Sequence, residues 1–516
     1  MLPEYRSTTY LDYSRPEHDT GMREALALVR SQAAASHPIV IGGKRIQTSA
    51  TFQSFNPANP TESLGTFAKG AAEHVAMAVD AATKAFPAWA ATAPDERANV
   101  LLRVAGTLRK RRHEMSATMV LEVGKSWGEA DGDTAEAIDF AEFYAREMLR
   151  YAERQPITPY PGENNALVYI PLGVGVVIPP WNFPCAITLG MTLATIVTGN
   201  TCILKPSSDA PLIAWKLFEI MEEAGVPPGV VNFLPGPGGV IGDGLVEHPG
   251  VRFIAFTGSM PVGIGINEKA AKVQKGQIWL KRAILEMGGK DFTIVDEEAD
   301  LDAAVAGVYA AAFGFQGQKC SACSRAIVHT KLYDEFLDRL AAKVKTMTIG
   351  PTEKKENYLG PVVNAGAEKT ILEYMEIGKK EGRLISGGGK HSGPGFFLQP
   401  TVIADIAPPA RISQEEIFGP VLAVLKASSF EQSVGIANGT MYGLTGAYYS
   451  RDRAKVAEAK RRLHVGNLYL NRRCTGALVG IHPFGGFNMS GTDSKAGGRD
   501  YLGLFMQGKT ITEYVG

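Results

Sequence analysis

"VGVVIPP", residues 174–180, is the first of five short β-branched runs that decide the fold. Helical stretches such as "APLIAWKLFEIMEEAG" (210–225) separate these runs. Strand–helix alternation at this spacing predicts right-handed βαβ units and a parallel, doubly wound sheet. Such a sheet binds ligands beyond the carboxyl ends of its strands. The other four runs are "NTCILKPSS" (200–208), "VVNFLPG" (230–236), "RFIAFTGS" (252–259) and "AILEMGG" (283–289).

A second alternating series follows residue 300 and predicts a second α/β domain. It contains "RAIVHT" (325–330), the helical "LYDEFLDRLAAKVKTM" (332–347) and "PVLAVLKA" (420–427). Upstream of the first sheet, residues 70–154 have apolar positions three to four apart, which predicts helices. Residues 1–36 are polar with one amphipathic piece, and we expect them to form an N-terminal helical arm.

Two extended segments, 157–173 and 504–516, fit neither sheet. Paired together they would form a small antiparallel arm, a device that proteins use to grip a neighbouring subunit. We therefore expect a homo-oligomer, at least a dimer.

Composition excludes several classes of protein. The 516 residues are too many for one core, and two or three domains are expected. Lys plus Arg equals Asp plus Glu at 53 each, so no basic excess indicates nucleic acid. Five scattered cysteines favour a reducing compartment over a disulfide framework. No signal sequence opens the chain and no apolar run reaches the ~18 residues of a membrane span, so we expect a soluble, cytoplasmic protein.

The loop "FGFQGQKCSACSR" (313–325) holds Cys320 and Cys323. A structural zinc site needs four ligands, and only one Cys-x-x-Cys occurs, so we expect no metal. A thioredoxin-like pair starts a helix after a strand, whereas here an Ala-rich helical stretch comes first and a strand follows. Two ordinary cysteines remain an alternative. The favoured interpretation is that Cys320 is a nucleophile.

A catalytic thiol needs a base and donors for the oxyanion it creates, because at neutral pH it is mostly protonated. Asn182, in "IPPWNFPCA", follows a predicted strand and offers an amide NH2 beside the backbone NH of Cys320. Glu286 ends another strand beside Gly288 and Gly289, which we expect to let a ligand approach the backbone. Desolvation there would raise the pKa of Glu286 and suit it to act as general base. Each residue also has a plainer interpretation, Asn182 as a turn residue and Glu286 as a surface acid.

These segments, with others in the same order and spacing, are similar to those of the aldehyde dehydrogenase superfamily over essentially the whole chain. The resemblance implies an α/β, aldehyde dehydrogenase-like fold with two doubly wound parallel-sheet domains and a small β oligomerisation arm. The matching motifs are "PWNFP" (180–184), "KPS" (205–207), "FTGSMPVG" (256–263), "LEMGGK" (285–290), "GQKCS" (317–321), "EEIFGP" (415–420) and "PFGGFNMSG" (483–491).

The resemblance also implies a division of the chain and a reaction. Cys320 attacks an aldehyde, Asn182 and the Cys320 NH hold the oxyanion, hydride passes to a nicotinamide, and Glu286 activates the water that hydrolyses the thioester. The implied division is an N-terminal helical arm (1–36), a dinucleotide-binding domain (37–156 and 174–285), a catalytic domain (286–482) and an oligomerisation arm (157–173 and 483–516).

The implied cofactor is NAD. Many NAD-preferring relatives carry Glu three residues after the lysine of "KPS", whereas this chain has Ser208. Our hypothesis is that NADP is tolerated better than in those relatives. The run "GPGGVIGDG" (236–244) lacks the G-x-G-x-x-G spacing of a dinucleotide fingerprint. The residues implied to bind the cofactor are Trp181, Lys205, Ser208, Gly236, Ser259, Gly263, Gly288, Glu416 and Phe418.

Within the superfamily, "YPGENN" (160–165) and "HVGNLYLNRRCTGALVG" (464–480) resemble the 1-pyrroline-5-carboxylate dehydrogenase subfamily. The resemblance implies oxidation of L-glutamate γ-semialdehyde to L-glutamate, the second step of proline catabolism. A zwitterionic substrate needs donors for its carboxylate and an acceptor for its ammonium group. Those residues are implied to be Ser321, Gly476 and Ala477 for the carboxylate and Glu136 for the amino group.

Four alternatives stay open. The enzyme could act on another semialdehyde, such as succinate semialdehyde, or the scaffold could be a non-catalytic cofactor-binding protein. Gly476–Ala477 could be an ordinary loop and Glu136 an acid on a helix surface. Finally, we hypothesise that Cys323 forms a reversible disulfide with Cys320 under oxidant.

Overall fold

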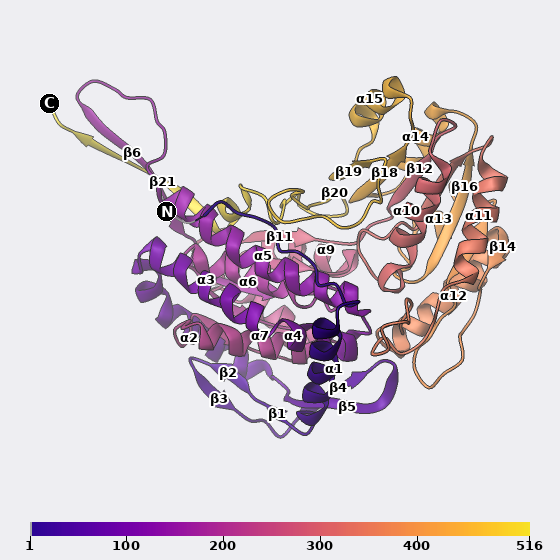
Figure 1. Ribbon diagram of the computed structural model, residues 1–516. Helices are drawn as coiled ribbons and strands as arrows, with labels where there is room; N and C mark the ends of the chain where they lie inside the picture. Colours follow the sequence, from indigo (N-terminus) through magenta and orange to yellow (C-terminus); the bar gives the residue numbers. More distant parts are fainter. Residues whose placement is uncertain (1–2) are drawn as a thin grey trace.

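The computed structural model describes residues 3–516, and two seven-stranded sheets dominate it (Figure 1). The first has the order β11-β10-β7-β8-β9-β2-β3. Its strands β7 to β11 are the five runs of the sequence prediction and pair in parallel, which confirms that prediction. Strands β2 and β3 extend one edge in antiparallel pairing. The bounds are β2 Ile39–Ile41, β3 Lys44–Ile46, β7 Val174–Ile178, β8 Thr201–Leu204, β9 Val231–Phe233, β10 Phe253–Thr257 and β11 Arg282–Glu286.

The second sheet has the order β14-β15-β16-β13-β12-β18-β19, and all its pairs are parallel except β14–β15. Its five inner strands are almost wholly buried on both faces, as strands covered on both sides of a sheet require, whereas the edge strands β14 and β19 are partly exposed. The expected second α/β sheet is therefore present. Its bounds are β12 Phe292–Val295, β13 Arg325–His329, β14 Arg383–Ser386, β15 Thr401–Ala404, β16 Val421–Ala427, β18 Thr445–Tyr449 and β19 Asn467–Leu470.

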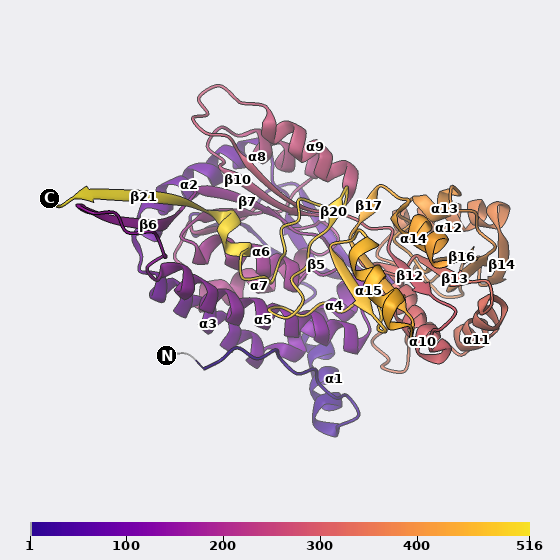
Figure 2. The same ribbon diagram turned by 90° about the horizontal axis from the view of Figure 1, so that it is seen from above.

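Helices cover both sheets. Seen from above, α8 and α9 lie on one side of the first sheet and α3 to α7 on the other (Figure 2). Its helices are α2 Ala72–Ala91, α3 Pro94–Lys110, α4 Arg112–Val123, α5 Trp127–Ala152, α6 Ala186–Val197, α7 Pro211–Glu223, α8 Asp243–Glu247 and α9 Met260–Ala271. Around the second sheet lie α10 Leu301–Phe313, α11 Tyr333–Lys345, α12 Ala365–Glu381, α13 Arg411–Gln414, α14 Phe430–Asn438 and α15 Arg453–Arg462. No helix within residues 3–516 is both long and apolar enough to cross a membrane.

The N-terminal segment is only partly helical, unlike the expected arm over 1–36. Helix α1 (Pro16–Ser31) packs on α4, while residues 3–12 have no helix or strand. Residues 1–2 of the expected arm lie outside the described range. Asp131 and Asp139 of α5 bind the non-helical part through its backbone NH groups and hydroxyls, which explains its extended course.

The expected antiparallel arm is present. Strand β6 (Glu163–Pro171) pairs with β21 (Met506–Tyr514) in continuous register from Glu163–Tyr514 to Pro171–Met506. Figure 1 shows this ribbon projecting from the body of the molecule, with the C-terminus near its end. Two smaller sheets complete the fold, formed by β1 (Ser36–His37), β5 (Asn59–Ala68) and β4 (Thr51–Asn56), and by β17 (Tyr442–Gly443) and β20 (Phe487–Asn488).

The segment 483–505, which we grouped with the arm, lies elsewhere. Its Ser494 bonds to Glu286 at the end of β11, and Tyr501 stacks on Tyr144 of α5 at 5.5 Å between ring centroids. Of residues 483–516, β21 is the part that belongs to the projecting ribbon. The returning segment therefore contacts the end of β11 and Met287, where the connection between the two sheets begins.

Candidate active site

Cys320 lies where two cavities meet. One, of about 410 Å3, is lined by residues of α5, α6, the Cys320 loop and the segment 473–484. The other, of about 740 Å3, is lined by the ends of β7, β8 and β10, by α9 and by residues 416–418. Cys320 lines both cavities, so its sulfur can meet a molecule from either side. This is the carboxyl-end position expected of a ligand site in a doubly wound sheet.

The Cys320 loop is held by amide side chains rather than by regular structure. After α10 the backbone turns through Phe315 and Gln316, both with positive φ (50° and 57°). The Gln316 side chain donates to the carbonyls of Gly124 and Pro361 at 3.0 and 2.7 Å and accepts from Gly360 N at 3.0 Å. These bonds offset an unusual backbone conformation and fix where the loop presents Cys320.

Cys320 is a protonated thiol at rest. Burial, and then the nearby Asp291, Glu416 and Glu286 carboxylates, raise its pKa well above the ordinary value. It is partly exposed, whereas the other four cysteines are buried. A thiol in this setting needs a base to become a nucleophile.

Asn182 lies beside the Cys320 loop, as its predicted role requires. Its side chain is buried, and its Nδ2 donates to the carbonyl of Gln318 at 3.2 Å. The residue lines the larger cavity together with Cys320. Its amide group carries a second hydrogen, which is available to a developing oxyanion.

Glu286 has the environment predicted for a general base. Burial raises its pKa to about 7, although hydrogen bonds from Ser494 and the Gly486 NH favour the ionised form. Ser494 Oγ donates to Oε1 at 2.5 Å, and Gly486 N donates to Oε2 at 3.3 Å. Glu286 lines the smaller cavity with Cys320, and it contributes to the raised pKa of that thiol.

The two glycines near the end of β11 make room for the protein's own groups, and Gly288 also lines the larger cavity, where a ligand can approach it. A Cβ on Gly288 would lie 2.1 Å from Glu416 Oε2, and one on Gly289 would lie 2.5 Å from the carbonyl of Cys320. Gly289 N donates to Glu416 Oε1 at 3.0 Å. These glycines therefore permit Glu416 and the Cys320 loop to pack against the β11 terminus.

Most residues expected to bind a cofactor line the larger cavity. Ser259 precedes α9, so the cavity receives a helix N-terminus, which attracts anions. Lys205 is buried, which lowers its pKa to about 8. Trp181 and Phe418 meet edge to face at 5.5 Å between ring centroids. The predicted residues that line this cavity are Trp181, Lys205, Ser208, Ser259, Gly288, Glu416 and Phe418.

Two predicted glycines do not line this cavity. Gly236 packs on Gly70 and Ile241, and the neighbouring Gly238 and Gly239 line the wall instead. Gly263 faces inward, where an added Cβ would lie 2.4 Å from Met287 Sδ. Gly263 thus permits close packing of α9.

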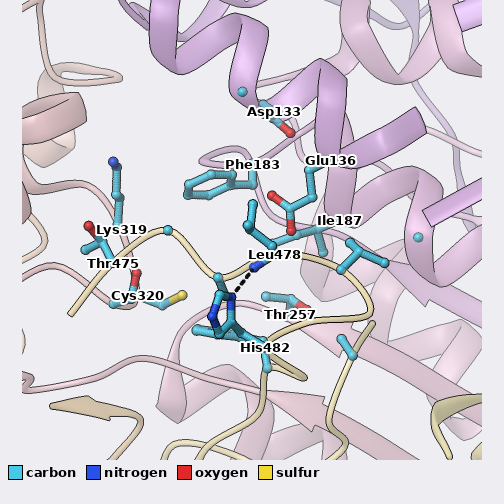
Figure 3. Close-up of a pocket in the computed structure, with 18 of the residues that line it drawn as sticks. Asp133, Glu136, Phe183, Ile187, Thr257, Lys319, Cys320, Thr475, Leu478 and His482 are labelled. Carbon is cyan, nitrogen blue, oxygen red and sulfur yellow. Dashed lines mark hydrogen bonds between the residues drawn. The ribbon is translucent and has the colours of Figure 1, made fainter. Parts of the chain in front are cut away.

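The smaller cavity gathers all four residues expected at a substrate headgroup: Glu136, Ser321, Gly476 and Ala477. Figure 3 shows Glu136 reaching from α5 into this cavity and the Cys320 sulfur facing it from another side. Burial, and then Asp133, raise the pKa of Glu136 to about 8. Gly476 has φ +81°, a conformation that glycine adopts without strain. The ring of His482 accepts from Leu478 N at 3.2 Å and shapes the same loop (Figure 3).

Sequence reasoning missed several residues of this cavity. Lys319, next to Cys320, forms a 2.6 Å ion pair with Glu129 of α5. Arg473 lines the same cavity, three residues before the predicted carboxylate-binding Gly476. The sequence signal for Lys319 was its position next to Cys320, and the signal for Arg473 was its position close to Gly476–Ala477. Tyr10 also lines it, from 310 residues upstream of Cys320, and no local pattern indicates that contact.

Cys323 has partners of its own. Its sulfur donates to Thr293 Oγ1 at 3.2 Å and lies within hydrogen-bonding reach of the Cys474 thiol. Both Cys323 and Cys474 are buried, and neither lines a cavity that Cys320 lines. This arrangement does not support a disulfide between Cys320 and Cys323.

Comparison with known proteins identifies relatives along the whole chain. Residues 45–511 match the model of the aldehyde dehydrogenase family. The 1-pyrroline-5-carboxylate dehydrogenase of Geobacillus thermodenitrificans is 53% identical over 513 residues, which cover 99% of this chain and 100% of the relative. 1-Pyrroline-5-carboxylate dehydrogenase 2 of Bacillus subtilis is 52% identical over the same shares of the two chains.

Solved structures give the same result. The 1-pyrroline-5-carboxylate dehydrogenase from Thermus with bound NAD superposes with a TM-score of 0.98 at 49% identity, covering 99% of each chain. Betaine aldehyde dehydrogenase from Staphylococcus aureus, in complex with NAD+, has a TM-score of 0.89 at 28% identity and covers 96% of this chain and 98% of that one.

Proposed function

This chain belongs to the aldehyde dehydrogenase family, and from that premise we propose that it oxidises L-glutamate γ-semialdehyde, in equilibrium with 1-pyrroline-5-carboxylate, to L-glutamate with NAD. The observation that carries the proposal is the position of Cys320, which lines both a cavity with amino-acid-binding groups and a cavity suited to a dinucleotide. Relatives more than 50% identical over their full length bear the name of this activity.

Residues of the larger cavity fit NAD. A buried lysine, Lys205, can donate to ribose hydroxyls, and the α9 N-terminus at Ser259 can hold a pyrophosphate. Trp181, Glu416 and Phe418 can hold the nicotinamide half next to Cys320. Bound there, NAD would supply the hydride acceptor, which is the chemistry that the side chains lack.

In the first step the Cys320 thiol adds to the aldehyde carbon, and its proton passes to a base. Glu286, with a pKa near 7 and a place in the same cavity, is the available carboxylate. The aldehyde oxygen becomes an oxyanion, which the Asn182 amide and the Cys320 NH stabilise. A tetrahedral thiohemiacetal results, and loss of a hydride from its carbon leaves a thioester on Cys320.

Before the second step Glu286 releases the first proton to solvent. It then accepts a proton from water, which attacks the thioester carbonyl. The C–S bond breaks, the carboxylic acid leaves, and Cys320 regains its proton. The raised pKa of Cys320 makes it a poorer leaving group than an ordinary thiol, so this step depends strongly on the base and on Asn182.

The smaller cavity favours an amino-acid semialdehyde. Glu136 can accept from the ammonium group, while Ser321 and the backbone NH groups of Gly476 and Ala477 can donate to the α-carboxylate. A second candidate is succinate semialdehyde, because Arg473 in the same cavity suits a carboxylate without an amino group.

A substrate panel tests the proposal. With NAD, kcat/KM should be highest for pyrroline-5-carboxylate, lower for succinate semialdehyde and lowest for butanal. The Glu136→Gln variant should lose preference for the first substrate while keeping activity on butanal. A wild-type preference for succinate semialdehyde would overturn the proposal in favour of the second candidate.

The proposal extends to assembly and location. The β6–β21 arm carries apolar side chains that a monomer leaves exposed, including Ile511 (44%) and Tyr514 (80%), and these would be covered by a second copy of the chain. Five unpaired thiols fit a reducing cytoplasm. Light scattering of the full chain and of a chain ending at Phe505 tests the assembly, since truncation should lower the molecular mass to that of a smaller species.

A further inference from the structure

A strap formed by residues 3–12 crosses helix α5 beside the smaller cavity. Thr8 N and Oγ1 both donate to Asp139 Oδ1, at 2.8 and 2.7 Å, and Leu11 N donates to Asp131 Oδ2 at 2.8 Å. Arg112 reinforces the second attachment, since it bonds to Asp131 and to the carbonyl of Thr9. The strap is therefore fixed at two points eight residues apart along α5.

The strap also contacts the loop expected to bind the substrate carboxylate. Tyr5 Oη donates to the carbonyl of Val479 at 3.0 Å, and its ring meets Phe143 edge to face at 5.2 Å. Gly480 has φ +74°, and a Cβ there would lie 2.9 Å from the Tyr5 ring. Strap, α5 and loop thus form one packed unit around the end of the cavity.

Tyr10 occupies the interval between the two attachments. Eight residues of α5 span ~12 Å, and the three-residue step from Thr8 to Leu11 spans ~10 Å when extended, so the strap follows this stretch of α5. Tyr10 directly precedes Leu11 and therefore lies nearer the Asp131 attachment. A Cβ on Gly132 would lie 3.9 Å from Tyr10 Cζ, and Gly132 is one helical turn from Glu136. Burial, and then the Glu136 carboxylate, raise the pKa of the Tyr10 phenol, while Arg473 opposes that rise. Tyr10 is 55% exposed yet lines the cavity, which places it at the mouth.

We propose that Tyr10 is a specificity-determining residue, whose ring forms the outer wall of the cavity beyond the substrate headgroup and sets the length of the amino-acid aldehyde. This inference rests on the proposed function. If the aldehyde carbon is held at Cys320 and the headgroup at Glu136 and Gly476–Ala477, an added methylene moves the headgroup outward, toward Tyr10. The hydrogen bonds of the strap to Asp131 and Asp139 hold the backbone on both sides of Tyr10 and prevent the ring from moving outward.

The physical basis is the cost of one methylene in a fitted cavity. A pocket that excludes one extra methylene discriminates by ~10–200-fold. Replacing Tyr10 by Ala removes the ring while keeping the backbone attachments, which involve Thr8 and Leu11. The gain in kcat/KM for the longer homologue should therefore be much larger than any loss in kcat/KM for glutamate γ-semialdehyde.

The test compares glutamate γ-semialdehyde with its homologue one methylene longer, 2-amino-6-oxohexanoate, in the full-length enzyme with NAD. The wild type should prefer the shorter substrate, and Tyr10→Ala should reduce that ratio of kcat/KM values by about tenfold or more. Tyr10→Phe, which keeps the ring, should retain the wild-type ratio. Butanal is too short to reach the mouth, so its kcat/KM should stay within about twofold in both variants.

Three results would overturn the inference. The first is an unchanged ratio of kcat/KM values in Tyr10→Ala, and the second is an equally reduced ratio in Tyr10→Phe. The third is a fall in kcat/KM for butanal as large as that for the semialdehydes, which would indicate general damage to the enzyme. Tyr160→Ala, which removes another exposed tyrosine, is the matched control and should leave all three substrates unaffected. Failure of the proposed function is distinguishable, because it would appear in the wild type as no turnover of glutamate γ-semialdehyde.

Discussion

Ser494 donates a 2.5 Å hydrogen bond to the carboxylate of Glu286, although 208 residues separate the two in sequence. The bond joins the segment that returns after the second sheet to the last residue of a strand in the first. Burial raises the pKa of Glu286, and the Ser494 bond opposes that rise because it stabilises the ionised form. The returning segment thereby adjusts the acidity of the proposed base.

Replacing Ser494 by Ala should move the acidic limb of the pH–kcat profile upward. Loss of a donor to the carboxylate raises the Glu286 pKa above about 7, so less of the base is ionised at a given pH. A hydrogen bond to a charged group contributes ~1.5 kcal/mol or more, which corresponds to about one pH unit. Activity should fall severalfold at pH 6.5 and little at pH 9. Thr492→Ser keeps the neighbouring hydroxyl and should leave the limb in place, and a downward shift in Ser494→Ala would contradict the assignment.

Cys320 should be the one cysteine that a small alkylating reagent modifies rapidly in the native protein, because the other four are buried. Its raised pKa keeps it protonated near neutrality, so the rate should rise ~10-fold per pH unit through pH 9 without a plateau. Mass spectrometry of intact protein measures the number of modified sites. Cys320→Ala should show no rapid modification and should lose at least ~10³-fold in turnover. Rapid labelling of that variant would refute the assignment.

Asn182→Ala should lower kcat by ~10²–10³-fold, the usual cost of one oxyanion donor. The direct effect on NAD affinity should be small, because the proposed contact is with the aldehyde oxygen. Asn182→Asp should be at least as impaired, since a carboxylate would repel the oxyanion. Steady-state kinetics and NAD titration by fluorescence separate the two quantities, and a selective loss of NAD affinity would contradict this role.

The sheet strands and the site differ in how well local sequence predicts them. The β-branched run at 174–178 and its four successors specify parallel strands by composition and spacing alone, and Cys320, Asn182 and Glu286 follow strand ends or a helix. Gly236 and Gly263 show the limit of that reasoning, because a glycine that admits Ile241 or Met287 has the same sequence signal as one that admits a ligand. Tyr10 and Ser494 reach the cavity and the base only through long-range packing, which no periodicity encodes.

Ser208 should make the cofactor preference moderate. It is exposed at the larger cavity, where a serine cannot repel a 2′-phosphate. The wild-type ratio of kcat/KM for NAD over NADP should therefore stay below ~10³. Ser208→Glu should lower kcat/KM for NADP about tenfold, because a partly screened carboxylate would face that phosphate. Ser208→Gln is the uncharged control. An equal loss of kcat/KM for NADP in both variants would show that the size of the side chain, and not its charge, causes the effect.

Removing one partner of the buried pair Lys125–Asp133 should destabilise the protein more than removing one partner of an exposed ion pair. The Lys125 ammonium lies 2.8 Å from Asp133, with both side chains fully buried, and 3.8 Å from the centre of the Phe183 ring. Lys125→Met removes one partner and leaves an unpaired carboxylate, at a cost of ~3–5 kcal/mol. The apparent Tm at a fixed scan rate should fall by about 5–10 °C. Adding Asp133→Asn should recover most of the loss, because no unpaired charge then remains.

Lys84→Met breaks a pair with Asp80 that is exposed to solvent, and the Tm should stay within about 1 °C. Equal shifts in Lys125→Met and Lys84→Met would refute the assigned cost of the unpaired charge.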